Sequence, residues 1–501
     1  MQLTEAREAL KTYQSTMSAY AHAMSSIYFD GSTVAPRGTA ANRAKTLGVL
    51  SEICYRLSTS EETVGMLELL DQNRDALTRE EARAVFLALK DIREMQKIPM
   101  EEYVAYQQLT VEAEDIWHTA KETNDFALFM PYLERIFDTQ QRFAVYCAPD
   151  KEPYDYCLGK YEDGLTMERC DAFFAALKSR LVPLIKKIGA CPAPSEACLM
   201  GDFDEASQQA FSYELMRTMG IDLDHCGLAT TEHPFTTSLG SHHDVRITTN
   251  YKRDNVASSM YSVIHEGGHA LYDLGSADEL AYTLLDGGVS MGIHESQSRF
   301  YENLLGRSRP FLSHVFPLMQ AAFPTQMEGY TVEDVYRAVN VVRPSLIRTE
   351  ADEVTYSLHI MVRYELEKRI MRGELAVRDL PTAWGALYKE YLGIDVPNDT
   401  EGVLQDTHWS GGMIGYFPSY ALGSAYGAQL LRAMRREIDV DACLASGNLA
   451  PINAWNREHI WKYGSLIPPN ELLASALGEP FDPYVYVEYL ENKYSKLYDL
   501  Q

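Results

Sequence analysis

The sequence has few of the features that hold small secreted proteins together. Its eight cysteines are scattered over 501 residues, and no two of them form a C-x-x-C pair. This spacing favours neither a disulfide framework nor a zinc ribbon, so we expect free thiols in a reducing compartment. A hydrophobic core must therefore stabilise the fold, and a hydrophobic content of 46% is ample for one.

Basic residues and long apolar runs are also scarce. The chain has 45 lysines and arginines against 71 acidic residues, which gives a formal net charge of −26. We expect no nucleic-acid partner, because phosphate binding needs a basic surface. No stretch approaches the ~20 apolar residues of a membrane span, and residues 1–15 lack the apolar core of a signal peptide. The sequence thus predicts a cytoplasmic protein without a membrane partner.

Most of the chain has the periodicity of amphipathic helices. Apolar residues recur three and four positions apart, and we predict helices over residues 167–188, 205–219, 331–342, 346–371, 380–392, 422–438 and 484–500, among others. Residues 244–251 alternate instead, as a strand does, and residues 236–239 are expected to pair with them across Gly240 and Ser241. The fold class predicted is all-α, mainly helical, with one small β-sheet at the active cleft.

The segment that organises the rest is His-Glu-Gly-Gly-His at residues 265–269. On a helix, His265 and His269 lie one turn apart on the same face, so both imidazoles can reach one metal ion. Glu266 lies beside them, where a metal-bound water would be. A catalytic zinc site takes three protein ligands, and Glu295, 26 residues after His269, is the candidate for the third.

Two adjacent glycines inside this helix support a functional interpretation. Each costs about 1 kcal/mol relative to alanine in a helix, so a purely structural helix would rarely carry both. Gly267 and Gly268 are therefore expected to let another backbone approach closely, with a substrate as one candidate. The predicted hairpin just before the helix has a free edge that can hydrogen-bond an extended peptide. A plain structural hairpin is the alternative.

Six motifs in order resemble the carboxypeptidase Taq family of zinc metallocarboxypeptidases. They are His233-Pro-Phe235, Asp244-Val-Arg-Ile-Thr248, the helix 265–269, His294-Glu-Ser-Gln297, Ile347-Arg-Thr-Glu-Ala-Asp352 and Gly402-Val-Leu-Gln-Asp-Thr-His-Trp409. The resemblance implies a single peptidase domain over residues 1–501, with two helical lobes flanking a deep groove as in other helical gluzincins, and catalytic motifs within 233–420. It also implies release of single residues from peptide C-termini with broad specificity, zinc or sometimes cobalt as cofactor, and a homodimer.

Such an enzyme needs a cation for the free carboxylate of its peptide substrate. We expect Arg348 to supply it, because guanidinium pairs with carboxylate through two parallel bonds. A structural ion pair of Arg348 with Glu350 or Asp352 is the alternative, and Arg246 on the predicted strand is the next candidate cation. Glu266 is expected to take a proton from the zinc-activated water and pass it to the leaving amine.

The oxyanion of the reaction needs hydrogen-bond donors. The segment Gly415-Tyr-Phe-Pro-Ser-Tyr420 resembles the tyrosine-bearing segment of related gluzincins, and we favour Tyr420 over Tyr416, although core packing is an alternative for both. His408 is a further candidate donor or substrate contact.

The remaining histidines are expected to be structural or to contact substrate rather than metal: His233, His242 and His243. His294 is expected to be structural or to lie behind a metal ligand, and Asp352 is a candidate carboxylate behind a metal-bound histidine. Some gluzincins carry an acid four residues after the glutamate ligand, and here that position is Arg299.

Three other functions stay open on the sequence alone. An aminopeptidase of similar fold would need an acidic cluster for the substrate amine, and an endopeptidase would need no cation for a C-terminus. A zinc-dependent scaffold without activity is the third, and Glu266 argues against it because structural zinc does not need that acid.

Overall fold

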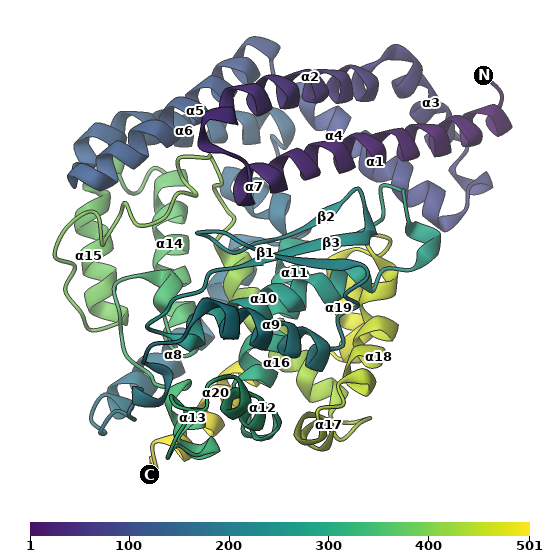
Figure 1. Ribbon diagram of the computed structural model, residues 1–501. Helices are drawn as coiled ribbons and strands as arrows, with labels where there is room; N and C mark the ends of the chain where they lie inside the picture. The colour runs from purple at the N-terminus through teal and green to yellow at the C-terminus, as the bar shows by residue number, and fades with distance from the viewer. Residues whose placement is uncertain (501) are drawn as a thin grey trace.

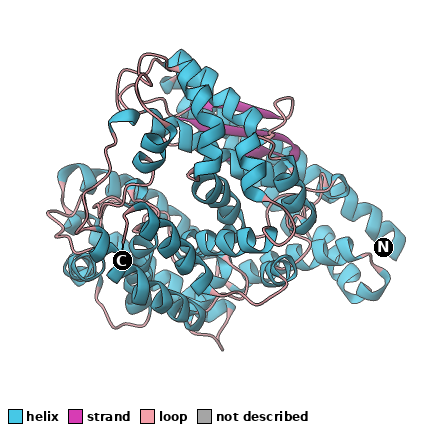
Figure 2. Ribbon diagram, turned by 90° about the horizontal axis from the view of Figure 1, so that it is seen from below, coloured by secondary structure: helices cyan, strands magenta, loops and turns pink. Residues whose placement is uncertain are grey.

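The computed structural model describes residues 1–500 as a helical molecule around one small sheet (Figure 1). The α-helices are α1 Leu3–Thr33, α2 Ala40–Thr59, α3 Glu61–Gln72, α4 Arg79–Lys97, α5 Met100–Thr123, α6 Phe126–Cys147, α7 Pro153–Tyr161, α8 Met167–Ile188, α9 Glu205–Met219, α10 Val256–Leu274, α11 Met291–Arg299, α12 Arg309–Ala322, α13 Val332–Ala338, α14 Tyr356–Met371, α15 Leu380–Tyr391, α16 Pro418–Met434, α17 Val440–Ser446, α18 Ala450–His459, α19 Pro469–Leu477 and α20 Pro483–Leu497. The strands are β1 Cys226–Thr230, β2 Thr236–Leu239 and β3 Ser241–Thr249. The predicted fold class is confirmed, and Figure 2 shows the strands confined to one part of the molecule.

The predicted helices are confirmed in most places, and two of them, α8 and α9, have the predicted bounds. The helix predicted over 346–371 is wrong in its first ten residues, where only the single turn η6 (Arg348–Glu350) forms before α14 begins. The reason is Asp352, whose carboxylate accepts hydrogen bonds from the backbone N–H groups of Val354, Thr355 and Arg343. These bonds hold a turn directly before α14, so the helix begins later than apolar spacing alone suggested.

The sheet has the order β1-β3-β2. The predicted hairpin of β2 and β3 is confirmed as an antiparallel pair, with Thr236 opposite Ile247. Strand β1 was not predicted, and it pairs in parallel with β3. Ser238 lies opposite Val245 but Leu239 opposite Ser241, so residues 242–244 bulge out of the ladder with β2.

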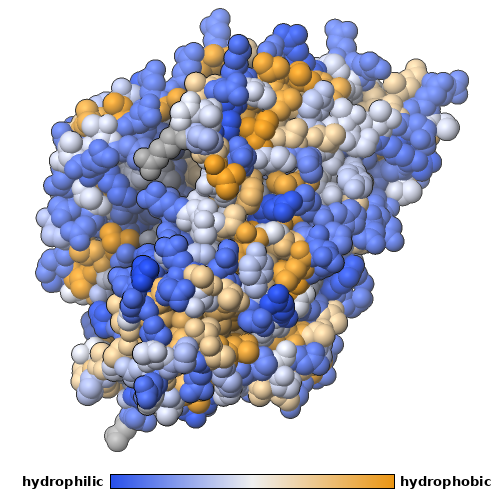
Figure 3. All heavy atoms as spheres, viewed as in Figure 1, coloured by the Kyte–Doolittle hydropathy of each residue, from blue (hydrophilic) through white to orange (hydrophobic). Residues whose placement is uncertain are grey.

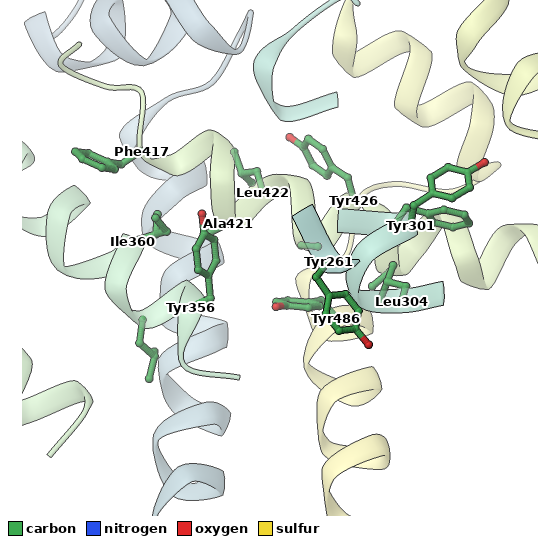
Figure 4. Close-up of a cluster of buried hydrophobic side chains, with 14 of the residues drawn as sticks. Tyr261, Tyr301, Leu304, Tyr356, Ile360, Phe417, Ala421, Leu422, Tyr426 and Tyr486 are labelled. Carbon is green, nitrogen blue, oxygen red and sulfur yellow. The ribbon is translucent and has the colours of Figure 1, made fainter. Parts of the chain in front are cut away.

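The sheet and two helices build the centre of the molecule. Helix α10 packs on β3 and on α9, and α11 packs on α10 and, more extensively, on α16. Figure 4 shows part of the apolar core around them, with Leu422 and Tyr426 from α16, Tyr356 and Ile360 from α14, and Tyr261 from α10. One large core therefore fixes the helices that carry the histidine motif.

A second, smaller core joins α1, α3 and α4, whereas α2 buries none of its side chains among the described residues. The molecular face in Figure 3 is mostly hydrophilic, with small groups of hydrophobic residues between. All eight cysteines are free thiols, as expected. No helix within residues 1–500 combines the length and apolarity needed to cross a bilayer.

Candidate active site

The three predicted metal ligands come together at the contact of α10 and α11. His265 Nε2 and His269 Nε2 lie 3.8 and 3.6 Å from Glu295 Oε2, and the three donor atoms fit within 4.8 Å of one another. Donors around a tetrahedral zinc ion, with bonds of about 2.0–2.2 Å, lie roughly 3.4 Å apart. The side chains present therefore suit a divalent cation with little rearrangement.

Both imidazoles are oriented through their other nitrogen. His265 Nδ1 lies 2.8 Å from Glu302 Oε2, and His269 Nδ1 lies 2.8 Å from His294 Nδ1. His294 in turn reaches Asp273 Oδ1 through Nε2, at 3.1 Å. With Nδ1 engaged, each ligand presents Nε2, which is the arrangement that holds metal-binding histidines in place. His294 thus lies behind a predicted ligand, as expected, whereas the expectation for Asp352 is wrong because that carboxylate binds backbone N–H groups of the turn before α14.

Arg299 neutralises the acidic side of this cluster. Its Nε donates to Glu295 Oε1 at 2.7 Å and its Nη1 donates to Glu302 Oε2 at 3.1 Å. Burial alone would raise the pKa of Glu295, but Arg299 and the two histidines hold that pKa well below its usual range. The pKa of Glu302 is depressed in the same way. Both carboxylates therefore stay ionised, and Glu295 keeps Oε2 directed at the histidines.

Close helix packing places Glu295. A Cβ on Gly268 would lie 2.7 Å from the carbonyl oxygen of Gln297 on α11, and a Cβ on Gly423 of α16 would lie 2.7 Å from Glu295 Cβ. Helix α11 is therefore clamped between glycines of its two neighbours. The expectation of a close backbone is confirmed for Gly268, but the backbone is that of α11 rather than a substrate. Gly267 instead faces the flexible side chain of Met219.

The chain directly after α11 winds into a π-helix, η5 (Phe300–Gly306). Such a segment shifts the side chains relative to a regular helix, and π-turns concentrate at functional sites. Glu302 lies on η5, and the shift coincides with its contact to His265. The helix geometry thus supplies a carboxylate behind the first histidine.

Glu266 is buried, with 7% of its surface exposed, and it is held by the hairpin. Thr236 Oγ1 on β2 donates to Glu266 Oε2 at 2.6 Å and lies 3.0 Å from the Glu266 carbonyl oxygen. This contact fixes one carboxylate oxygen and leaves the other to accept a proton. The sheet edge and the acid predicted as a base are therefore directly connected.

Arg348 lies in a buried ion cluster. Its Nε and Nη2 donate to Asp406 Oδ1 at 3.0 and 2.8 Å, and Arg363 Nε donates to Asp406 Oδ2 at 2.7 Å. The ion partner of Arg348 is thus neither Glu350 nor Asp352, the two alternatives considered above. Two guanidinium groups share one carboxylate, so this cluster carries one unbalanced positive charge.

Two tyrosines and a histidine surround this cluster. The Arg348 guanidinium carbon lies 4.9 Å from the centre of the Tyr420 ring, and the Tyr420 hydroxyl lies 3.1 Å from His408 Nε2. The Tyr416 ring centre lies 5.0 Å from that of Tyr420. Burial, together with Arg348 and Arg363, lowers the pKa of His408 to about 4, so the imidazole is neutral near pH 7. Burial also raises the pKa of Tyr416 to about 12, which keeps its hydroxyl a donor.

A short path of contacts joins the ion cluster to the ligand group. Arg299, which binds Glu295, stacks its guanidinium 4.2 Å from the centre of the Tyr356 ring. The Tyr356 hydroxyl accepts a hydrogen bond from Arg348 Nη1 at 3.2 Å. One side chain, Tyr356, therefore separates the two arginines.

The other two predicted substrate residues lie on the sheet. His233 is exposed in the loop between β1 and β2. Arg246 on β3 pairs with Asp244 at 2.8 Å and lies against Gly227 of β1. Within residues 1–500, neither side chain hydrogen-bonds to the ligand group or to the ion cluster.

Six residues of this site were not identified from the sequence: Thr236, Asp273, Glu302, Tyr356, Arg363 and Asp406. A signal existed for Asp273, which continues the four-residue ladder of His265 and His269. Asp406 belonged to a recognised motif, but its partners lie 43 and 58 residues away along the chain. Thr236 and Glu302 depend on the hairpin and on the π-helix, and spacing in the sequence does not show either contact.

Comparison with known proteins finds one family of relatives that matches nearly the whole chain. The family model of the carboxypeptidase Taq (M32) metallopeptidases matches residues 9–494. Carboxypeptidase 1 of Bacillus subtilis is 40% identical over 484 residues, covering 96% of either chain. Thermostable carboxypeptidase 1 of Pyrococcus furiosus is 37% identical, covering 95% of this chain and 96% of its own.

Solved structures agree with this comparison. The M32 carboxypeptidase of Deinococcus radiodurans superposes with a TM-score of 0.96 at 36% identity, over 99% of this chain and all of its own. Metallocarboxypeptidase 1 of Trypanosoma cruzi superposes with a TM-score of 0.93 at 31% identity, over 98% of this chain and all of its own.

Proposed function

We propose, since the chain belongs to the carboxypeptidase Taq (M32) family of metallopeptidases, that it releases single amino acids from free peptide C-termini with broad specificity. It is a metallocarboxypeptidase, a hydrolase of peptide bonds. The observation that carries the finer proposal is the path from Glu295 through Arg299 and Tyr356 to Arg348. Through these contacts the cation of Arg348 lies close to the predicted metal site. A cation there can bind a free C-terminal carboxylate, which the interior of a peptide lacks.

His265, His269 and Glu295 are the proposed ligands of one zinc ion, with cobalt as a substitute. Two imidazoles and one carboxylate are a common ligand set of catalytic zinc. Bound there, the cation would act as a Lewis acid that polarises the peptide carbonyl and makes a water acidic. Glu302 orients His265, and the pair of His294 and Asp273 orients His269.

Glu266 is the proposed general base. Thr236 holds one carboxylate oxygen, so the other accepts the proton of the attacking water and then delivers it to the departing amine. Its burial supports this role, because a base shielded from bulk water keeps the proton for the leaving group. The β2 edge, which carries Thr236, is the proposed site where the substrate backbone pairs as an added strand.

Arg348 is the proposed contact for the substrate carboxylate. Three of its five N–H groups bind Asp406 and Tyr356, which leaves two for a substrate. The excess positive charge that it shares with Arg363 favours an anion in a nearly dry site. Arg246 on the sheet and His233 in its loop are proposed to contact the peptide substrate further from its C-terminal carboxylate.

The hydroxyl of Tyr420 is the proposed oxyanion donor, and Tyr416 is the second candidate. Neutral His408 fixes the Tyr420 hydroxyl through its 3.1 Å contact, so it has a proposed positioning role. We further propose one peptidase domain over residues 1–501 with two helical lobes flanking a deep groove, a homodimer, and a cytoplasmic location, since the family resemblance and the acidic composition favour them.

A pair of peptides tests the proposal. One peptide has a free C-terminus, its twin is amidated, and both are incubated with and without chelator while products are followed by mass spectrometry. We expect stepwise loss of single C-terminal residues from the free acid only, abolished by chelator and restored by zinc. Internal cleavage, or equal cleavage of the amidated twin, would contradict the proposed activity.

A further inference from the structure

A second group of metal-ligating side chains lies outside the site described above. His242 and His243 come from the β3 bulge and Asp278 comes from the turn η4 (Asp278–Leu280), and one donor atom of each fits within 4.8 Å of the others. Consecutive residues of a regular strand point to opposite faces. The bulge removes that restriction, and the centres of the two imidazole rings lie 4.1 Å apart.

A buried carboxylate fixes the orientation of His242. Asp286 accepts the backbone N–H of His242 at 3.1 Å through one oxygen and lies 2.7 Å from Nδ1 through the other. The two side chains are only 3% and 6% exposed. Nδ1 must therefore carry hydrogen, and in a neutral ring the lone pair lies on Nε2. A carboxylate behind Nδ1 is the usual support of a metal-binding imidazole.

The free nitrogen of His242 meets a second carboxylate. Nε2 lies 3.4 Å from Asp278 Oδ1, and this contact is favourable only when a proton on Nε2 or a metal cation lies between the two atoms. That separation equals the roughly 3.4 Å between donors around tetrahedral zinc. His243 uses its backbone N–H in a hydrogen bond to Ser241, and its ring lies beside that of His242 with a donor nitrogen within reach of the same ion.

We propose that His242, His243 and Asp278 bind a second divalent transition-metal ion, of the zinc class. Two imidazoles and a carboxylate are the donors that such ions prefer. The group borders a cavity of about 710 Å³ that also contains His225, and this cavity leaves room for a fourth ligand, either water or His225. This proposal replaces the expectation that His242 and His243 are not metal-bound.

The position of the site indicates what the ion does. It joins β3 to η4, which lies in the connection between α10 and α11. Those two helices carry the three proposed catalytic ligands, so the ion fastens the connecting segment to the sheet. A site of this kind stabilises the fold and takes no part in hydrolysis, and the inference does not depend on the proposed function.

Counting bound ions tests the inference. Full-length protein is loaded with zinc and desalted, and its metal content is measured by elemental analysis. We expect two ions per chain in the wild type, one in Asp278→Asn and in His243→Ala, and two in the matched control Glu279→Gln. The zinc-induced rise in Tm should be smaller in the first two variants than in the control.

One ion per wild-type chain, or two ions retained in both site variants, would overturn the inference; in the first case a proton lies between His242 and Asp278. Asp278 has an 80% exposed side chain, so Asp278→Asn carries the test even if His243→Ala fails to fold. Peptide hydrolysis should persist in both variants. Loss of hydrolysis in His265→Ala would concern the proposed function alone.

Discussion

At the scale of single residues, the contact between Thr236 and Glu266 is the most direct link between structure and rate. Glu266→Gln should keep the metal and lower kcat by roughly 10²–10⁴-fold, the usual contribution of a general base. Thr236→Val should lower kcat less, by about 10–150-fold, because it removes one hydrogen bond to a charged group, worth about 1.5–3 kcal/mol. Steady-state kinetics with metal analysis measures both.

The neighbouring Thr237 provides a matched control, since successive side chains of a strand point to opposite faces. Thr237→Val should leave kcat unchanged. If Thr236→Val and Thr237→Val were equally active, the hydrogen bond to Glu266 would have no role in catalysis.

Arg348 can be removed without leaving an unpaired carboxylate, because Asp406 keeps its contact with Arg363. Arg348→Ala should therefore fold, bind metal, and lose about 10–150-fold in kcat/KM for free-acid peptides, the equivalent of about 1.5–3 kcal/mol. Arg348→Lys should recover part of that, since a point charge replaces a planar fork.

Any residual cleavage of amidated peptides should be unaffected by these changes, because such peptides never make the contact. Arg343→Ala, at an exposed arginine paired with Glu196, controls for a general loss of positive charge. A folded, metal-loaded Arg348→Ala enzyme that still prefers free acids as the wild type does would move the role to Arg246.

At the scale of elements, alanine substitutions at the two glycines of the histidine motif should lower zinc affinity by different amounts. Gly268→Ala forces α10 away from the α11 backbone, so it should lower zinc affinity by about 10–100-fold through displacement of Glu295. The new methyl group of Gly267→Ala meets the flexible Met219 side chain, so this substitution should lower zinc affinity far less. Competition with a chromogenic chelator measures both affinities, and equal affinities would show that α11 is not clamped by Gly268.

The same elements show where prediction from sequence succeeds. The grouping of His265, His269 and Glu295 followed from the four-residue period and one downstream acid, because helix geometry converts that spacing into proximity. Strand β1 escaped notice because Cys-Gly-Leu-Ala-Thr at residues 226–230 has neither alternation nor consecutive β-branched residues. The π-helix that carries Glu302 was not predicted because it arises from packing in three dimensions, which a linear sequence pattern does not contain.

At the scale of the whole molecule, acid should weaken the fold through Asp406. Burial would raise the pKa of Asp406, but Arg363 and Arg348 hold that pKa well below its usual range. The unfolded chain therefore takes up a proton near pH 4 that the folded chain refuses. The stability that Asp406 contributes is present above about pH 4 and is lost as pH falls below it.

Asp406→Asn tests this at the level of global unfolding. It should lower stability by roughly 3–5 kcal/mol at pH 7, since two arginines lose their buried partner, and its Tm should approach that of the wild type as pH falls below 4. Metal-free protein avoids effects of metal release at low pH. Asp395→Asn, at a carboxylate with 84% side-chain exposure, should track the wild type. A Tm difference for Asp406→Asn that stays constant from pH 7 to 3 would contradict the prediction.

The surface of the chain is larger than that of a compact monomer. It measures 22014 Å² for 56.6 kDa, against roughly 18,600 Å² for a typical globular monomer of that mass. The excess leaves surface for the proposed homodimer to cover, α2 included. Sedimentation equilibrium should return twice the chain mass, and a concentration-independent monomer would refute the dimer.

The clamp on α11 also sets an order of events during synthesis. His265, His269, Glu295 and Glu302 have all been translated by residue 302, whereas Gly423 on α16 follows 423 − 302 = 121 residues later. At about 5–20 residues per second, the growing chain holds the three proposed metal ligands, with Glu302 behind His265, for roughly 6–24 s before α16 is available to pack on α11. A nascent chain can thus capture an ion on loosely packed helices, and the metal present at the ribosome, rather than the metal best suited to the finished site, has the first opportunity to bind.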